Sequence, residues 1–234
     1  MPAPLIVAHR GAWEQVPQNS PAALEAAIEL GCEMVELDVR TTRDRELVVV
    51  HDARVGGVAV SAQNASDLRR RLAPGQAPDL EAMIECAKGR IRLDIELKTD
   101  DQLDRTLAII HRHLDPSGYV VTSFLDGALA AVRALSAETR TGLLIRPGRR
   151  PRRLSDRLTE AQISFLAPHA SLARAGLLAW AAERGLESFL WTVNDRRAAR
   201  TLLADPRVTA LITDRPGRLL QARSELSESE APTS

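Results

Sequence analysis

Four short apolar runs in the sequence end in ionisable side chains, and these side chains are the ones that could carry out chemistry. The first run, Leu5–Gly11, ends in a histidine, an arginine and a glycine. The other three runs are Met34–Asp38, Val48–Asp52 and Leu93–Lys98. A charged group at the end of a buried segment needs a partner or a metal, because burial of an unpaired charge is strongly unfavourable. The polar ends of these runs are therefore the candidate site residues.

His9 and His51 are two of only five histidines, and each is the first polar residue after its apolar run. A histidine with an ordinary pKa of ~6.5 can accept a proton at one stage of a reaction and donate one at another. Two of them at one place can serve as base and acid across a scissile bond. A lone histidine in such a position is more often a packed or surface group, so the hypothesis requires that the two converge.

Three carboxylates form the second candidate group. Glu36 and Asp38 are two residues apart on a predicted strand and therefore share a face, and Glu96 ends the next long strand. Such a cluster of negative charge needs a cation, and oxygen ligands favour a hard divalent ion, Mg²⁺ or Ca²⁺. No cysteine lies nearby, which argues against zinc. The alternative is a structural ion-pair network, for which these cations are available: Arg10, Arg40 and Lys98.

Arg10 and Lys98 also suit a phosphate group. Arginine offers a bidentate fork and lysine a compact point charge. A pair of histidines, a hard metal and two cations together describe the cleavage of a phosphodiester better than sugar or acyl chemistry.

The elements that must position these residues follow a strand–helix rhythm. Strands are predicted at 5–9, 34–38, 91–98 and about 119–124, 141–145, 164–168, 188–193 and 209–213. Helices are predicted at 22–30 and 80–88 and near 101–114, 126–137, 155–161, 171–184 and 195–204. Eight parallel strands with intervening helices predict an α/β fold, the closed (β/α)₈ TIM barrel. Functional residues of such a barrel lie at the C-terminal ends of its strands.

Two local patterns refine this barrel. The apolar residues Ile91, Leu93, Ile95 and Leu97 alternate with charged ones, so the apolar face should pack under helices while the charged face points inward. The run Leu47–Val50 follows Asp38 too closely for a crossover helix. It therefore predicts a short antiparallel hairpin insertion after the second strand, which would return His51 to the site. The irregular segment 53–78 is predicted to be an insertion with a short helix near 65–72.

Composition and length limit the other possibilities. The 234 residues suit a single domain over 1–220, and the polar stretch 221–234 predicts a disordered C-terminal tail. Lys+Arg and Asp+Glu balance at 31 each, so no nucleic-acid partner is indicated. Cys32 and Cys86 lie in apolar contexts and are expected to be buried thiols in a cytoplasmic protein. No segment has the length and apolar content of a transmembrane helix. Oligomeric state is not predicted.

In the order of these motifs, the chain resembles the glycerophosphodiester phosphodiesterase family from Ile6 to Pro216. The resemblance rests on these segments: Ala8-His-Arg-Gly11, Pro17-Gln-Asn-Ser20, Val35-Glu-Leu-Asp38, Val50-His-Asp52, Ile95-Glu-Leu-Lys98, Ser123-Phe124, Trp191-Thr-Val-Asn194 and Ile212-Thr-Asp-Arg-Pro216. It implies a (β/α)₈ barrel with a divalent ion that hydrolyses glycerophosphodiesters to glycerol 3-phosphate and an alcohol, a reaction of lipid and glycerol metabolism. A hydroxyl of the substrate's glycerol would attack phosphorus, and water would open the resulting cyclic phosphate.

The resemblance also implies a role for each matching residue. The implied roles are an acid/base pair for His9 and His51, metal ligation for Glu36, Asp38 and Glu96, phosphate binding for Arg10 and Lys98, and a substrate contact for Trp191. Gly11 is expected to let the backbone turn away where a side chain would crowd the substrate. Which histidine is the acid remains open.

The chain departs from the family pattern at two places. Gln18 stands where the family usually has glutamate, which bears on metal binding or substrate preference. The segment after His51 is short, which would leave the mouth open to bulky headgroups.

An arginine-rich run, Arg146–Arg157, follows the fifth strand. Its simplest interpretation is a solvated loop, and the functional alternative is peripheral contact with anionic lipid. Lysophospholipase D-like cleavage of single-chain phospholipids is therefore an alternative function. An alternative of a different class is a non-catalytic phosphate-binding barrel.

Overall fold

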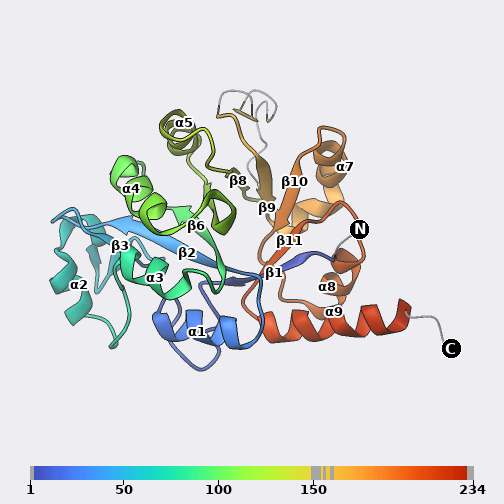
Figure 1. The fold of residues 1–234 in the computed structure, drawn as a ribbon, viewed down its shortest axis with the longest axis horizontal. Coiled ribbons are helices and arrows are strands. Elements are labelled where there is room, and N and C mark those ends of the chain that lie inside the picture. The colour runs from blue at the N-terminus through green and yellow to red at the C-terminus, as the bar shows by residue number, and fades with distance from the viewer. Residues whose placement is uncertain (1–2, 149–153, 155–156, 159–160, 231–234) are drawn as a thin grey trace.

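The computed structural model describes residues 3–148, 154, 157–158 and 161–230. Within these residues, eight parallel strands form a closed barrel (Figure 1). The barrel strands are β1 (Leu5–His9), β2 (Met34–Thr41), β6 (Arg92–Leu97), β7 (Tyr119–Ser123), β8 (Thr141–Ile145), β9 (Phe165–Pro168), β10 (Glu187–Leu190) and β11 (Ala210–Thr213). Strand β1 closes the ring because it pairs in parallel with both β2 and β11. The predicted TIM barrel is confirmed.

Helices alternate with these strands and cover the outside of the barrel. They are α1 (Pro21–Glu29), α3 (Leu80–Ala87), α4 (Leu103–His113), α5 (Asp126–Leu135), α7 (Leu177–Ala182), α8 (Arg196–Leu203) and α9 (Pro216–Glu230), with short 3₁₀ turns η2 (Pro116–Gly118) and η3 (Ala170–Ala175). The start of α1 follows from its sequence: Ser20 Oγ accepts a hydrogen bond from the Ala23 amide at 3.1 Å, and Pro21 fits the first helical position. The helix predicted at 155–161 lies mostly outside the described residues.

Strand β6 shows how the sequence pattern positions the site. Leu93, Ile95 and Leu97 are buried in the main hydrophobic core, together with residues of α3 and α4. The intervening side chains point to the inside of the barrel, where Asp94 and Glu96 line a cavity. The predicted division of this strand into an apolar outer face and a charged inner face is confirmed.

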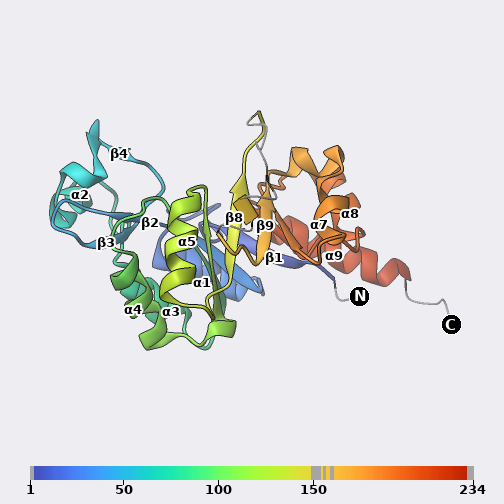
Figure 2. The same ribbon diagram turned by 90° about the horizontal axis from the view of Figure 1, so that it is seen from above.

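The insertion after β2 begins with strand β3 (Leu47–Val49), which pairs antiparallel with β2. The chain continues through the hairpin β4 (Arg54–Val55) and β5 (Val58–Ala59), the turn η1 (Val60–Ala62) and the short helix α2 (Ala65–Arg70). Figure 2 shows β4 and α2 beyond β2 and β3, at one side of the molecule. A small separate core holds this part together and contains Val48, Val60, Ala65, Leu68 and Ala77. The predicted hairpin insertion is thus present.

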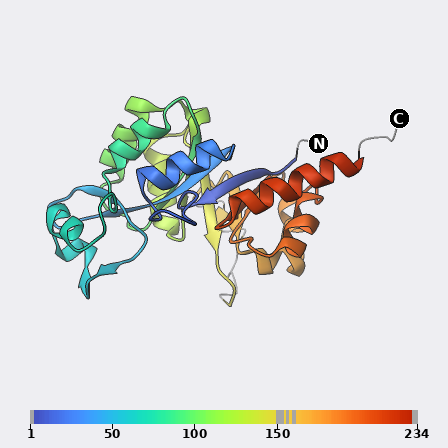
Figure 3. The same cartoon turned by 90° about the horizontal axis from the view of Figure 1, so that it is seen from below.

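The expected disordered tail from residue 221 is not what the structure shows, because α9 continues to Glu230. Leu219 and Ala222 are buried in the second core cluster, and α9 lies beside β1 (Figure 3). Glu225 pairs with Arg196 and Arg200 of α8, at 3.0 and 2.8 Å. These contacts with distant parts of the chain stabilise a helix whose own sequence is polar. Residues 231–234 lie outside the described part.

The two cysteines are free thiols, as predicted; Cys32 is buried and Cys86 is partly exposed. Among the described residues, no helix combines the length and the apolar content that crossing a membrane requires.

Candidate active site

A cavity of about 170 Å³ lies at the C-terminal ends of the barrel strands. Seven of the predicted site residues line it: His9, Arg10, Glu36, His51, Glu96, Lys98 and Trp191. The eighth, Asp38, is fully buried and contacts two of the lining residues, Arg10 and Lys98. The barrel therefore brings together residues that are separated by more than half of the chain.

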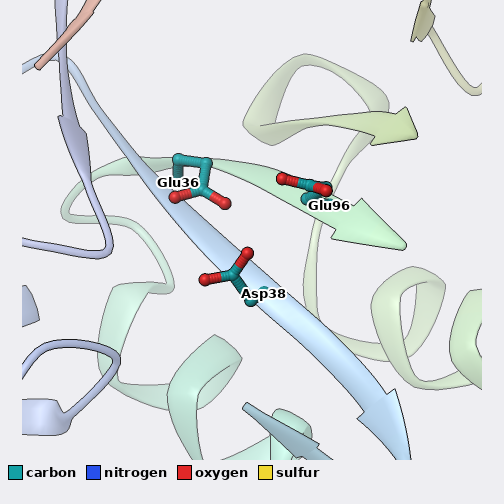
Figure 4. Close-up of side chains that lie close together, drawn as sticks. All are labelled: Glu36, Asp38 and Glu96. Carbon is teal, nitrogen blue, oxygen red and sulfur yellow. The ribbon is translucent and has the colours of Figure 1, made fainter. Parts of the chain in front are cut away.

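The three predicted metal ligands converge from two neighbouring strands (Figure 4). Each of Glu36, Asp38 and Glu96 offers one oxygen, and these oxygens all lie within 4.8 Å of one another. Among the described residues, Glu36 Oε1 is buried without a hydrogen-bond partner. Burial, followed by the charges of Asp38 and Glu96, raises the pKa of Glu36 well above its usual value. The ionised form of Glu36 is therefore unfavourable unless a further cation compensates it, so these residues fit a divalent cation.

Asp38 differs from Glu36 because cations surround it. Its Oδ1 lies 2.7 Å from Lys98 Nζ, and its Oδ2 lies 3.2 Å from Arg10 Nε. Asn19 Nδ2 also donates to Oδ2 at 2.7 Å. Burial acts to raise the pKa of Asp38, but Lys98 and Arg10 outweigh it and the pKa is lowered. The ion-pair alternative therefore describes Asp38 and leaves Glu36 unexplained.

Lys98 bridges two of the carboxylates, because its ammonium also contacts Glu96. Burial acts to lower the pKa of Lys98, but Glu96 and Asp38 outweigh it and raise the pKa. The pKa of Glu96 is raised by burial, against the opposing effect of Lys98. Arg40, the other available cation, donates from Nε and Nη2 to the carbonyl of His51 at 2.9 and 2.8 Å. Its side chain therefore holds the histidine's backbone.

His9 is held by a carboxylate that was not among the predicted site residues. Its Nδ1 lies 2.6 Å from Asp214 Oδ1, and Asn194 Nδ2 donates to Asp214 Oδ2 at 2.6 Å. Burial acts to raise the pKa of Asp214, but the hydrogen bonds from His9 and Asn194 outweigh it and lower the pKa. The other ring nitrogen, Nε2, lies 3.8 Å from Glu36 Oε2. His9 therefore presents Nε2 toward the carboxylate cluster.

His51 has a similar partner in a more open setting. Its Nδ1 lies 2.8 Å from Asp52 Oδ1, but the Asp52 side chain is 68% exposed, against 23% for Asp214. Burial lowers the pKa of His51, and the hydrogen bond with Asp52 opposes this effect. Val50 N donates to the carbonyl of Asp38 at 2.8 Å, which returns the chain from the hairpin to the barrel. The predicted convergence of His9 and His51 on one cavity is confirmed.

Asp94 is a second residue that the sequence analysis did not select. It is fully buried, and its Oδ1 accepts a hydrogen bond from Thr122 Oγ1 at 2.6 Å. Its Oδ2 has no hydrogen-bond partner in the part of the chain that the structure describes. Burial raises the pKa of Asp94 to about 7. The signal for Asp94 was present, since it lies on the charged face of the same strand as Glu96. The signal for Asp214 was its position directly after β11.

Arg10 and Gly11 form the turn that ends β1. Arg10 adopts the left-handed conformation at φ 60°, and its Nη1 donates to Gln18 Oε1 at 2.9 Å. Gln18 thus contacts Arg10. The presence of glutamine instead of the glutamate that the resemblance led us to expect therefore mainly affects how this arginine is held. Gly11 also has a positive φ, and a Cβ atom there would lie 2.7 Å from backbone atoms of Ala23 in α1. The expectation that a side chain would crowd the substrate is therefore wrong: it would clash with the helix.

Trp191 lines the cavity and packs against two aromatic rings. Its ring meets Phe124 edge-on with centroids 5.5 Å apart, and it contacts His169 in the same manner at 5.2 Å. Trp191 Nε1 donates to the carbonyl of Ala167 at 2.7 Å, which fixes the ring. Of the arginine-rich run, Arg146 and Arg157 are described; these members lie outside the described residues: Arg149, Arg150, Arg152 and Arg153.

Comparison with known proteins agrees with this arrangement. Residues 9–218 match the model of the glycerophosphoryl diester phosphodiesterase family. A glycerophosphodiester phosphodiesterase of Caldanaerobacter subterraneus subsp. tengcongensis is 27% identical over 237 residues, which cover 92% of this chain and 96% of that relative.

Two solved structures show the same fold. A glycerophosphodiester phosphodiesterase from Parabacteroides distasonis is 25% identical, with a TM-score of 0.84 over 96% of this chain and 98% of that one. A phosphodiesterase from Oleispira antarctica, solved in complex with the product sn-glycerol-3-phosphate, is 23% identical, with a TM-score of 0.84 over 95% and 97% of the two chains. The chain therefore belongs to the glycerophosphoryl diester phosphodiesterase family, a family of phosphoric diester hydrolases.

Proposed function

We propose that this protein hydrolyses glycerophosphodiesters to glycerol 3-phosphate and an alcohol, with His9 and His51 as the acid/base pair. The observation that carries the proposal is the single cavity lined by both histidines and by the buried carboxylates Glu36 and Glu96. Each histidine has one ring nitrogen fixed by an aspartate, which leaves the other nitrogen available to exchange a proton.

A divalent cation, Mg²⁺ or Ca²⁺, is proposed to bind Glu36, Asp38 and Glu96. The support is the close approach of their oxygens, the buried Glu36 Oε1 without a described partner, and the raised pKa of Glu36, which a bound cation would lower. When bound, such an ion acts as a Lewis acid that stabilises negative charge on the phosphate and on the attacking oxygen.

Arg10 and Lys98 are proposed to bind the phosphate. Both side chains line the cavity and carry charge at its wall. Lys98 is held between Asp38 and Glu96, and Arg10 between Asp38 and Gln18, so both cations have fixed positions before substrate arrives. Fixed charges of this kind stabilise a transition state without reorganisation. Trp191 is proposed to contact the glycerol or the leaving group.

In the proposed mechanism, one histidine removes the proton from a hydroxyl of the substrate's glycerol, and that oxygen attacks phosphorus. The second histidine protonates the departing alcohol. Water then opens the cyclic phosphate with the proton transfers reversed, which yields glycerol 3-phosphate. Asp214 keeps the His9 ring oriented during both stages, because its carboxylate accepts from Nδ1.

The proposal is tested with purified protein, Mg²⁺ or Ca²⁺ and glycerophosphocholine or glycerophosphoglycerol, with release of glycerol 3-phosphate as the readout. His9→Ala and His51→Ala should each abolish turnover and leave the protein folded, because both side chains border a cavity. Activity retained in either variant would show that the acid/base pair is wrong. Absence of turnover with every metal, on both glycerophosphodiesters and lysolipids, would refute the proposed hydrolysis and favour the alternative of a non-catalytic phosphate-binding barrel.

The acid and the base can be distinguished with a substrate whose leaving group needs no proton. In a glycerophosphodiester of 4-nitrophenol, the leaving group departs as a stable phenolate. The variant that lacks the general acid should recover much of its activity with this substrate, whereas the variant that lacks the base should not. Equal recovery in both variants would contradict a division into one acid and one base.

Lysophospholipase D-like activity is a second candidate, because a groove of about 820 Å³ shares Glu96, Lys98 and Phe124 with the cavity. Leu125 and Leu144 add apolar surface to this groove, which suits the acyl chain of a single-chain phospholipid. Rates on glycerophosphocholine and lysophosphatidylcholine decide between the two: a strong preference for the former removes the lipid candidate. We also propose that the protein contacts anionic lipid peripherally through Arg146–Arg157. We further propose a cytoplasmic location, which the two free cysteines support.

A further inference from the structure

Phe124 and Arg146 form one wall of the active-site cavity, and they follow the neighbouring strands β7 and β8. The guanidinium carbon of Arg146 lies 3.9 Å from the centroid of the Phe124 ring. This is a close cation–π stack. The ring of Phe124 also meets Trp191 edge-on, so the two aromatic side chains of this wall support each other.

The same two residues line the larger groove that continues from the cavity. Lys98 belongs to both spaces, so a substrate whose phosphate contacts Lys98 can extend from the cavity into the groove. A leaving alcohol on that path would pass Phe124 and Arg146. These two side chains are therefore placed to sense the charge of the leaving alcohol.

Arg146 contributes a positive charge to this wall, and no described carboxylate forms an ion pair with it. Of the other arginines that line the groove, Arg157 pairs with Asp126 through Nε at 2.6 Å, and Arg40 donates to a backbone carbonyl. No ion pair of Arg146 occurs within the described ranges of the chain. Asp100, an exposed carboxylate, lines the groove but is absent from the lining of the inner cavity.

We propose that Arg146 is a specificity-determining residue that selects glycerophosphodiesters whose leaving alcohol carries no positive charge. The inference rests on the proposed function and names its substrate class. Aromatic rings such as Phe124 attract quaternary ammonium groups, but the Arg146 guanidinium already covers a face of this ring and repels a second cation. Its N–H groups can instead donate to the hydroxyls of a polyol or to an anionic group on the leaving alcohol.

The test compares two diesters that differ in the charge of the leaving alcohol, glycerophosphoglycerol and glycerophosphocholine. The wild-type protein should prefer glycerophosphoglycerol in kcat/KM. In Arg146→Gln, the ratio of the choline to the glycerol diester should rise about tenfold, which corresponds to about 1.4 kcal/mol. Arg146→Lys keeps the charge, so its ratio should stay within about twofold of wild type.

Two further variants separate this effect from general loss of a stacked arginine. Arg184 lies over Trp180 at 4.2 Å and lines neither the cavity nor the groove, so Arg184→Gln should leave the ratio unchanged. In a Phe124→Leu background, Arg146→Gln should give a smaller gain for the choline diester, because the ring that the substitution uncovers is gone. Melting temperatures of all variants identify any that are misfolded.

Binding measurements make the test independent of turnover. Calorimetric titration of the His51→Ala protein with each diester, with and without Arg146→Gln, should show the same tenfold shift in the ratio of affinities. A shift in binding without turnover in the wild-type enzyme would refute the proposed hydrolysis and support the role of Arg146. An unchanged ratio in Arg146→Gln, or the same shift in Arg146→Lys, would overturn the inference.

Discussion

Replacement of Asp214 by asparagine tests how His9 is positioned. Asp214 Oδ1 lies 2.6 Å from His9 Nδ1, and Asn194 holds the other oxygen. Asparagine keeps the shape of the side chain but removes its charge. The carboxylate orients the imidazole and stabilises its protonated form, and a neutral amide does neither as well.

The size of the effect follows from the type of hydrogen bond that is lost. A hydrogen bond to a charged group contributes about 1.5–3 kcal/mol. If this stabilisation is used in the transition state, kcat of Asp214→Asn falls by about 10- to 150-fold. KM should change little, because Asp214 acts through His9. Release of glycerol 3-phosphate, measured from acid to alkaline pH with saturating metal, gives both constants.

Asp52→Asn is the matched control, since Asp52 holds Nδ1 of the other histidine. The Asp52 side chain is 68% exposed, so solvent screens its interaction with His51. An exposed pair is typically worth about 0–1 kcal/mol, and the loss in kcat should stay below about fivefold. Equal losses in the two variants, or full activity in Asp214→Asn, would refute the argument that burial decides how strongly each aspartate supports its histidine.

Three further predictions concern the metal site and the turn after β1. In Glu36→Gln the rise in melting temperature on addition of Mg²⁺ or Ca²⁺ should disappear. The metal-free variant should be at least as stable as the wild-type protein, because the substitution removes a buried carboxylate with an unpartnered oxygen. A full metal-induced rise in the variant, measured by scanning calorimetry with and without chelator, would contradict this. Gly11→Ala should lower the free energy of unfolding by about 3 kcal/mol and the melting temperature by about 6–12 °C, since φ is +84° and the new Cβ would lie 2.7 Å from Ala23. The control Gly31→Ala, with φ +82° and no atom within 4 Å of the new Cβ, should lower it by only about 1 kcal/mol. Equal losses of stability in the two variants would count against the clash with Ala23. The pKa of Asp94 is raised from 3.8 to about 7, so the folded state binds a proton that the unfolded state releases. This contribution to stability is complete below about pH 4 and is lost as pH rises through about 7. The melting temperature of chelator-treated Asp94→Asn should therefore rise by a few °C relative to that of wild type between about pH 5 and pH 8, whereas a difference in melting temperature that does not change with pH would show that Asp94 does not titrate as described.

The sequence by itself predicted the barrel and most of the residues that line the candidate site. Local periodicity carries this information: the alternation in residues 91–98 predicted which side of β6 faces the helices, and the short spacing from Asp38 to Leu47 predicted the hairpin. The convergence of His9 and His51 followed from the rule that the C-terminal ends of barrel strands share one mouth.

The tertiary structure decided which partner each charged group takes. The contact between His9 and Asp214 joins residues 205 positions apart, and it exists because β11 pairs with β1. In the same way, Glu225 of α9 finds its cations on α8, so a polar segment that predicted disorder is helical.

Charge balance within the site was likewise a tertiary property. Lys98 lies between Asp38 and Glu96, whereas Glu36, on the same strand as Asp38, has an oxygen without a described partner. Spacing along the chain placed these carboxylates on one face but could not assign the cations to them. The assignment depends on distances between strands that only the closure of the barrel fixes, because electrostatic energy depends on separation and burial in space.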